Sequence, residues 1–233
     1  MASLFLIPTT LSDSPLDRVL PNNNSNIIKS TKFFIVENVR TARRFLKQVD
    51  RDIDIDTLQF FELNKHTDAK VIASYLDPLK GGNDVGIISE AGCPAIADPG
   101  ADVVAIAQKR KYNVVPLVGP SSILMSLMAS GFNGQSFAFQ GYLPIEKSDR
   151  TARLKQLEKR VYSEHQTQIF IETPYRNIQL LEEMCKTLQP QTKLCVAVDI
   201  TSKTEEIRTL SIADWKKQKI ELHKRPCVFL IYK

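Results

Sequence analysis

The sequence has few cysteines and histidines and no long apolar run. No stretch approaches the about 18 consecutive apolar residues that a membrane-spanning helix needs, so we expect no membrane anchor. No basic segment precedes the apolar stretch at residues 1–10, which predicts a first strand rather than a signal peptide. The scarcity of cysteine and histidine, the usual metal ligands, argues against a bound metal. The few cysteines are expected to be reduced, mostly buried thiols in a cytoplasmic protein. The cysteines form no Cys-x-x-Cys pair. The cysteines and histidines of the chain are Cys93, Cys185, Cys195, Cys227, His66, His165 and His223.

The positive charge of the chain is unevenly distributed. The 233 residues are 43% hydrophobic, enough for one large core or two modest ones, and carry a net charge of +5. Residues 1–144 hold 14 basic and 14 acidic side chains, whereas residues 145–233 hold 17 and 12. The basic residues of the second part cluster at 147–160 and 216–225. This excess suits a phosphate-rich partner such as RNA, and a solvated helix face explains it nearly as well.

Apolar strand-like runs alternate with helical patterns along the chain. In the first half we expect strands at 3–8, 32–37, 57–63, 84–89 and 113–118, and helices at 39–49, 67–79 and 101–111. The asparagine-rich residues 22–26 predict a surface turn. In the second half we expect helices at 121–130, 150–162 and 177–188, and strands at 137–141, 168–172, 193–198, 206–211 and 227–232.

This alternation predicts an α/β protein with two domains, 1–118 and 119–233, hinged near residues 116–120. The first should contain a mainly parallel sheet covered on both faces. In the second, the last two strands follow each other closely in sequence, which predicts a mixed sheet.

A loop of twelve residues, 89–100, follows the buried strand pattern at 85–88 and precedes a helix. It contains two glycines, two prolines and two acids, far more than a bare strand-to-helix connection needs. Ligands of open α/β sheets bind at the carboxyl ends of the strands, which makes this loop a candidate binding element. An ordinary long loop is the alternative interpretation.

A second loop follows the next strand and has the sequence Gly119-Pro120-Ser121-Ser122. Glycine supplies backbone freedom, proline suits a helix entry, and either serine can cap the first turn. Capping alone would explain the serines. Two such loops after successive strands nevertheless favour a shared crevice.

Three motifs in this order and spacing resemble the tetrapyrrole (corrin/porphyrin) methylase superfamily. They are the Ser-Glu-Ala-Gly-Cys-Pro…Asp-Pro-Gly of residues 89–100, the Val-Pro-Leu-Val-Gly-Pro of 115–120 and the Phe-Gln-Gly-Tyr-Leu-Pro of 139–144. Flanking segments at 6–10, 37–40 and 171–176 extend the resemblance over nearly the whole chain. Within the superfamily, the chain is most similar to the small-subunit rRNA cytidine 2′-O-methyltransferases.

The resemblance implies S-adenosylmethionine as cofactor, bound between the two domains, with rRNA or the small ribosomal subunit as substrate and a homodimer as the assembly. It places cofactor contacts at Leu11, Ala91, Gly92, Cys93, Ile96, Ser121, Ser122, Glu172, Ile200, Pro226 and Cys227. The first loop, residues 8–13, lacks the glycines usual in the superfamily, and the RNA branch also lacks most of them. Cys93 stands where that branch has threonine, so we interpret it as a small packing residue and not a nucleophile.

The expected reaction is direct displacement of the methyl group by a ribose oxygen, in which positioning supplies most of the catalysis. The hydroxyl must lose a proton, and Glu37 or Glu90, each following a strand, is the candidate general base. Arg40, one helical turn after Glu37, would pair with it or hold a phosphate; a surface ion pair is the alternative. Asp98 is expected to cap the following helix. Three hypotheses therefore stand: an RNA 2′-O-methyltransferase, a methyltransferase of a tetrapyrrole or other small molecule, and a nonenzymatic RNA-binding relative.

Overall fold

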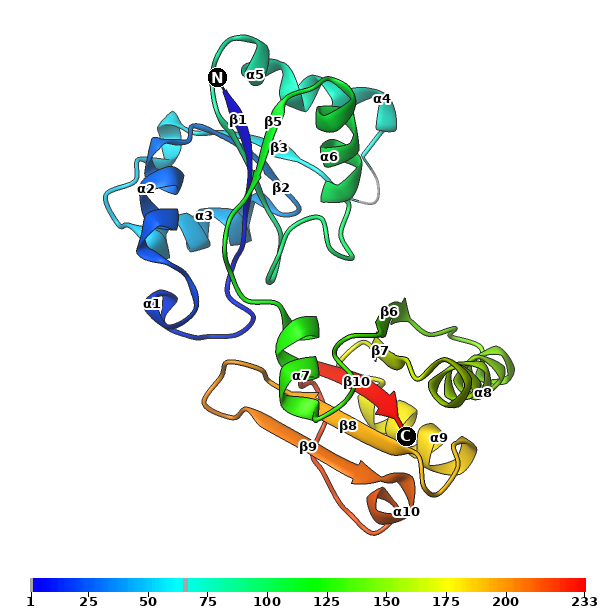
Figure 1. Cartoon of the computed structure of the whole chain (residues 1–233). Helices are drawn as coiled ribbons and strands as arrows, with labels where there is room; N and C mark the ends of the chain where they lie inside the picture. The colour runs from blue at the N-terminus through cyan, green and yellow to red at the C-terminus, as the bar shows by residue number, and fades with distance from the viewer. Residues whose placement is uncertain (1, 65–66) are drawn as a thin grey trace. The chain divides into compact units, whose positions relative to one another are not determined.

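The chain folds into two α/β units, Met1–Ser121 and Ser122–Lys233 (Figure 1). The structure is a computed structural model that describes residues 2–64 and 67–233. The contacts divide the chain between Ser121 and Ser122, and the sequence-based expectation places the division after Val118. Each unit has its own five-stranded sheet.

The sheet of the first unit is entirely parallel, in the order β3-β2-β4-β1-β5, as expected. Its register aligns Ile88 at the end of β4 with Ile7 on one side and Val36 on the other. The carboxyl ends of these strands therefore lie at one edge. The strands are β1 (Ser3–Ile7), β2 (Phe33–Val36), β3 (Gln59–Glu62), β4 (Val85–Ile88) and β5 (Asn113–Pro116).

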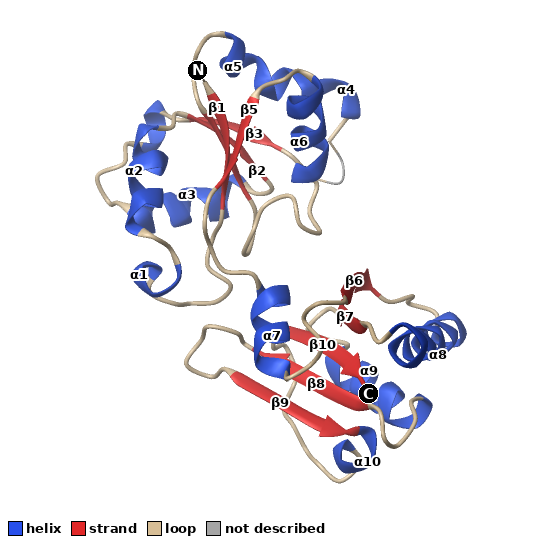
Figure 2. Cartoon of the chain, in the orientation of Figure 1, coloured by secondary structure: helices blue, strands red, loops and turns tan. Residues whose placement is uncertain are grey.

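Helices cover both faces of this sheet (Figure 2). Side chains alternate along the strands, so that Phe34 and Val36 pack toward α2 and α3 while Ile35 and Ile87 join the core on the other face. The helical segments are α1 (Leu16–Val19), α2 (Asn22–Ser30), α3 (Val39–Val49), η1 (Ile55–Thr57), α4 (Ala69–Ile72), η2 (Ala73–Leu76), α5 (Asp77–Lys80) and α6 (Gly100–Lys109).

Two local predictions for the first unit are wrong. The asparagine-rich segment is the helix α2, not a turn, because buried Asn24 donates from Nδ2 to the carbonyl oxygen of Val118 at 2.9 Å and Ile28 enters the core. Tertiary contacts thus override the weak helix propensity of asparagine. The expected single helix at 67–79 is three short segments, α4, η2 and α5, and Pro78 lies in the first turn of the last of them.

The second unit has a mixed sheet in the order β6-β7-β10-β8-β9, in which only β6 and β7 are parallel. The register places Ile171 beside Val228 and Val198 beside Cys227. The ends of β7 and β8 and the start of β10 therefore share one edge. The elements are α7 (Ser122–Ser130), β6 (Phe137–Tyr142), α8 (Lys147–Glu164), β7 (Thr167–Ile171), α9 (Asn177–Thr187), β8 (Lys193–Val198), β9 (Glu206–Ser211), α10 (Ile212–Trp215) and β10 (Cys227–Tyr232).

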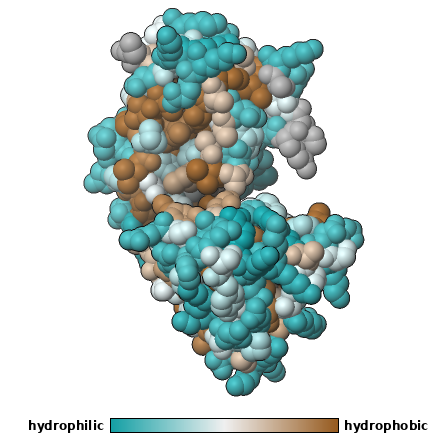
Figure 3. Space-filling model, turned by 45° about the vertical axis from the view of Figure 1, so that its right-hand side comes forward, coloured by the Kyte–Doolittle hydropathy of each residue, from teal (hydrophilic) through white to brown (hydrophobic). Residues whose placement is uncertain are grey.

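The core of this unit lies between the sheet and the helices α8, α9 and α10, where Phe170 and Phe229 stack with ring centroids 6.1 Å apart. The helix α7 packs on β9 and β10. On the face that Figure 3 shows, apolar residues gather on the first unit, whereas hydrophilic residues cover most of the second. Among the helices of the described ranges, none is long and apolar enough to cross a bilayer.

Candidate active site

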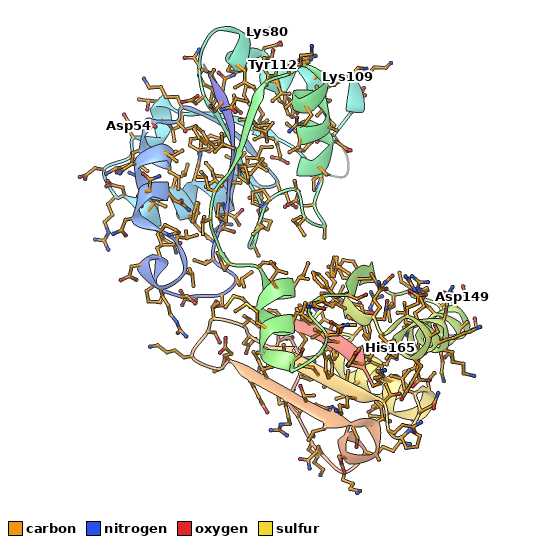
Figure 4. The ribbon with its side chains drawn as sticks, in the orientation of Figure 1. Asp54, Lys80, Lys109, Tyr112, Asp149 and His165 are labelled. Carbon is orange, nitrogen blue, oxygen red and sulfur yellow. The ribbon has the colours of Figure 1, made fainter. Side chains whose placement is uncertain are left out.

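Three loops meet at the carboxyl edge of the first sheet. The backbone amide of Thr9, after β1, donates to the carbonyl oxygen of Gly92, after β4, at 3.0 Å. The thiol of Cys93 lies 3.4 Å from the carbonyl oxygen of Pro120, after β5. The two glycine- and proline-containing loops therefore pack together within this unit. Side chains labelled in Figure 4 mark the opposite end, where β5 begins: Lys80, Lys109 and Tyr112.

Gly92 and Gly119 are required here for two different reasons. Gly92 has a φ of +71°, and a Cβ atom on it would lie 2.9 Å from Cδ2 of Leu11 and 3.3 Å from the carbonyl oxygen of Pro120. A Cβ atom on Gly119 would overlap the Pro8 ring at 2.2 Å. The loops thus approach so closely that side chains at these positions would separate them.

The segment that carries Ile96 is held in an uncommon backbone conformation. Ala95 and Ala97 have φ values of 66° and 62°, a region that residues other than glycine rarely adopt. The carboxylate of Asp98 accepts hydrogen bonds from the amides of Ala95, at 2.9 Å, and Gly100, at 2.7 Å. Asp98 thereby meets the first amide of α6, as expected of a cap, and the Ile96 side chain stays 56% exposed.

Two carboxylates lie side by side at the same edge. The amide of Glu90 donates to Oε1 of Glu37 at 3.3 Å, and the hydroxyl of Thr41 donates to Oε1 of Glu90 at 2.6 Å. Burial, together with the charges of Asp98 and Glu90, raises the pKa of Glu37 although the hydrogen bond from the Glu90 amide opposes it. Its carboxylate is thus a stronger base than a free glutamate.

Arg40 has no ion pair with Glu37 in the part of the chain that the structure describes, so the surface ion-pair alternative is not observed. Arg40 is exposed on the first turn of α3, which Asn38 caps by accepting from the amides of Arg40 and Thr41.

A hollow of about 150 Å³ opens beside Glu90 and contains polar side chains that sequence reasoning missed. Thr41, Arg44 and Gln48 line it from α3, spaced three and four residues apart, so that they share one helix face. This spacing is visible in the sequence, but nothing in the sequence pairs that face with the loop after β4. The other lining residues are Thr9, Thr10, Ala42, Phe45, Ile88 and Ser89.

Four of the predicted cofactor residues gather at one edge of the second sheet: Glu172, Ile200, Pro226 and Cys227. The amide of Asp199 donates to the carbonyl oxygen of Pro226 at 3.0 Å, which joins two of the three segments. Ile200 and Cys227 are each only 6% exposed, so a ligand at this edge would meet mainly backbone there. Burial raises the pKa of Cys227 to about 12, which keeps the thiol protonated.

The predicted residues therefore form two groups, one in each unit. The first unit contains the predicted cofactor residues Leu11, Ala91, Gly92, Cys93, Ile96 and Ser121. It also contains the predicted catalytic residues Glu37, Arg40 and Glu90. Ser122 is the first residue of α7, in the second unit. Within residues 2–64 and 67–233, no cluster of three His, Cys, Asp or Glu side chains is arranged to hold a metal, and His66 lies outside these ranges. Burial raises the pKa of the Cys93 thiol.

The basic cluster at 147–160 is not uniformly exposed. Arg150 is 7% exposed, and its guanidinium lies 2.6 Å from the carboxylate of Glu183 and donates to the carbonyl oxygen of Ile145 at 2.7 Å. It therefore fixes α8 to α9 and is not free to bind phosphate, whereas Lys147 and Lys155 are exposed. Figure 4 labels Asp149 and His165 near the two ends of α8.

Comparison with known proteins identifies the family. Residues 24–215 match the model of the Tetrapyrrole (Corrin/Porphyrin) Methylases. The chain belongs to this family. It is thus an S-adenosylmethionine-dependent methyltransferase, as the motifs of its loops indicate.

Two curated relatives carry the name Ribosomal RNA small subunit methyltransferase I. The one from Pseudomonas aeruginosa is 27% identical over 98% of this chain and 78% of its own length. The one from Bacillus subtilis is 30% identical over 88% of this chain and 66% of its own.

Solved structures of low sequence identity share the fold. The methyltransferase CobJ superposes with a TM-score of 0.65 at 12% identity, covering 100% of this chain and 95% of that one. The uroporphyrin-III C-methyltransferase of Thermus thermophilus in complex with S-adenosylhomocysteine gives 0.58 at 12% identity, with coverage of 100% and 98%.

Proposed function

We propose that this methyltransferase transfers a methyl group to the ribose 2′-oxygen of a cytidine in small-subunit rRNA. The observation that carries the proposal is the similarity, over 98% of the chain, to a relative named for methylation of the small ribosomal subunit RNA. The positive charge of residues 145–233 supports it, because cationic side chains attract the phosphates of RNA.

The proposed cofactor contacts are the loop residues of each group. The left-handed backbone of Gly92, without a Cβ atom, lets its loop pack closely against Leu11 and Pro120, and exposed Ile96 offers an apolar surface for an adenosine. The strained Ala95 and Ala97 that present Ile96 support this role, since such strain concentrates at ligand sites. Bound S-adenosylmethionine supplies a methyl group already activated by its sulfonium.

Glu37 and Glu90 would accept the proton that the ribose hydroxyl loses. Of the two, Glu37 is favoured, because burial raises its pKa above the usual value of a glutamate. Arg40 and Arg44, exposed on α3, would hold phosphate near these carboxylates. Cys93 would contribute only size and backbone geometry.

Transfer of labelled methyl groups from S-adenosylmethionine to isolated small ribosomal subunits tests the proposal. We expect one labelled nucleotide, a cytidine whose 2′-O-methyl group blocks alkaline cleavage at the following phosphate. Parallel reactions with uroporphyrinogen test the tetrapyrrole hypothesis. Label on the tetrapyrrole but not on the RNA would refute the RNA assignment, and cofactor binding without any transfer would favour the nonenzymatic hypothesis.

The proposal includes a homodimer, which the resemblance implies. Light scattering should then give twice the chain mass of 26.3 kDa, and a mass of one chain at micromolar concentration would contradict this part of the proposal.

A further inference from the structure

An exposed aromatic ring lies beside a lysine and a histidine at one edge of the second sheet. Tyr175, in the loop between β7 and α9, is 72% exposed, an unusual exposure for a large aromatic side chain. The ammonium of Lys224 lies over its ring, 6.0 Å from the centroid, and the ring of His223 meets it edge-on at 6.3 Å. We call these three residues the Tyr175 platform.

Hydrogen bonds hold the backbone on both sides of the platform. The amide of Lys224 donates to the carbonyl oxygen of Pro174 at 3.2 Å, and buried Asn177 donates from Nδ2 to the carbonyl oxygen of Arg225 at 2.6 Å. These bonds join the loop after β7 to the segment before β10. Lys224 itself has a φ of 60°, so its backbone is fixed in an uncommon conformation.

The base of the Tyr175 loop is equally constrained. Glu172 is 5% exposed, and its Oε1 accepts from the amide of Thr173 at 2.6 Å and from Nη2 of Arg176 at 2.6 Å. These hydrogen bonds order the loop, and the Tyr175 ring in it is not folded back onto the apolar surface of the protein. The ring is thus presented to solvent by a preorganised support.

We propose that the Tyr175 platform stacks one unpaired base of the RNA substrate while Lys224 contacts the adjoining phosphate. The inference rests on the proposed function and names the contact by which the second unit recognises the substrate. A π-face with an ammonium beside it matches a nucleotide, whose planar base stacks and whose phosphate attracts the ammonium. A base inside a duplex has both faces covered, so the platform selects single-stranded RNA.

Binding of the full-length protein to a fluorescein-labelled, unstructured pyrimidine 12-mer RNA tests the platform by fluorescence anisotropy. Tyr175→Ala should weaken binding by about 5- to 160-fold, the range typical of one stacked base, without changing the salt dependence. Tyr175→Trp should retain binding and Tyr175→Leu should not, because stacking requires a ring. Lys224→Ala should reduce the slope of log affinity against log salt by about 0.7, the value for one phosphate of a single strand.

Matched controls come from the opposite edge of the same sheet. Phe137→Ala removes another partly exposed aromatic ring, and Lys193→Ala removes one positive charge from the same unit; both should bind like the wild type. Cofactor affinity, measured by calorimetry, should be unchanged in every variant. Equal binding by Tyr175→Ala and Phe137→Ala, or by Tyr175→Leu and Tyr175→Trp, would refute the platform.

Methyl transfer to small ribosomal subunits separates this inference from the proposed function. If the wild type methylates the subunits and Tyr175→Ala does so with unchanged KM, the platform is refuted and the function stands. If Tyr175→Ala loses RNA binding but the wild type transfers no methyl to RNA, the platform stands and only the reaction is refuted. A wild type that neither binds nor methylates RNA refutes both.

Discussion

Replacing Gly92 by alanine should weaken cofactor binding, and Gly82 offers a matched control for the strain that this change introduces. The two glycines have similar φ values, +71° and +80°. An alanine in this region costs about 1–2 kcal/mol of backbone strain. A Cβ atom on Gly82 has no neighbour within 4 Å, whereas one on Gly92 would lie 2.9 Å from Cδ2 of Leu11.

The difference between the two variants therefore isolates the contacts around Gly92. Gly82→Ala should lower the free energy of unfolding by the strain alone, about 1–2 kcal/mol. Gly92→Ala also displaces Leu11 and crowds the carbonyl of Pro120, and because overpacking typically costs about 1–3 kcal/mol, the total loss should reach about 2–5 kcal/mol. Urea denaturation measures both values.

The displacement of Leu11 should also weaken cofactor binding. Because Leu11 and the backbone of Gly92 are proposed ligand contacts, we expect Gly92→Ala to weaken S-adenosylmethionine binding at least tenfold, about 1.4 kcal/mol. Gly82→Ala should bind like the wild type, and isothermal titration calorimetry on the folded proteins distinguishes them. Equal affinity of Gly92→Ala and the wild type, or an equal loss in both variants, would refute the reasoning.

Three further predictions concern single side chains. Cys93→Thr should keep most of the turnover, because burial raises the pKa of the thiol and direct displacement needs no nucleophile. Loss of most of the turnover in single-turnover assays would contradict this. Glu37→Gln should lower turnover by roughly 10²–10⁴-fold if this carboxylate is the base. The pKa of Glu37 is raised in the folded state, so the folded wild type loses stability as the pH rises from the usual glutamate range through the raised pKa and Glu37 ionises. Glu37→Gln avoids this loss and should therefore resist urea better than the wild type at neutral pH. In acid, where Glu37 is protonated, the difference should disappear. Arg150→Ala should cost about 3–5 kcal/mol of unfolding free energy because it leaves Glu183 as an unpaired buried charge, whereas Lys155→Ala should leave stability unchanged and reduce only the salt dependence of RNA binding.

Much of the secondary structure could be predicted because the responsible patterns are local. The strands at 193–198, 206–211 and 227–232 have the expected bounds, since each is an apolar or alternating run bordered by turn residues. The parallel and mixed sheets followed from the order of strands and helices. Where packing decides, the prediction was wrong: α2 exists because Asn24 and Ile28 are buried, which no propensity of an asparagine run indicates.

The sequence by itself determined the two loops of the first unit, because glycine and proline at fixed positions restrict the backbone locally. The motifs in these loops carried the resemblance to the family, and the resemblance implied the cofactor. It also indicated Glu37 and Glu90 as carboxylates at strand ends. Only the tertiary structure paired Glu90 with Thr41, buried Arg150 against Glu183 and set Tyr175 beside Lys224. Each of these partners lies between 33 and 49 residues away in the chain. These pairs come together only through the order and register of the strands. The packing of the whole core fixes that order and register, and no short segment of the sequence encodes them.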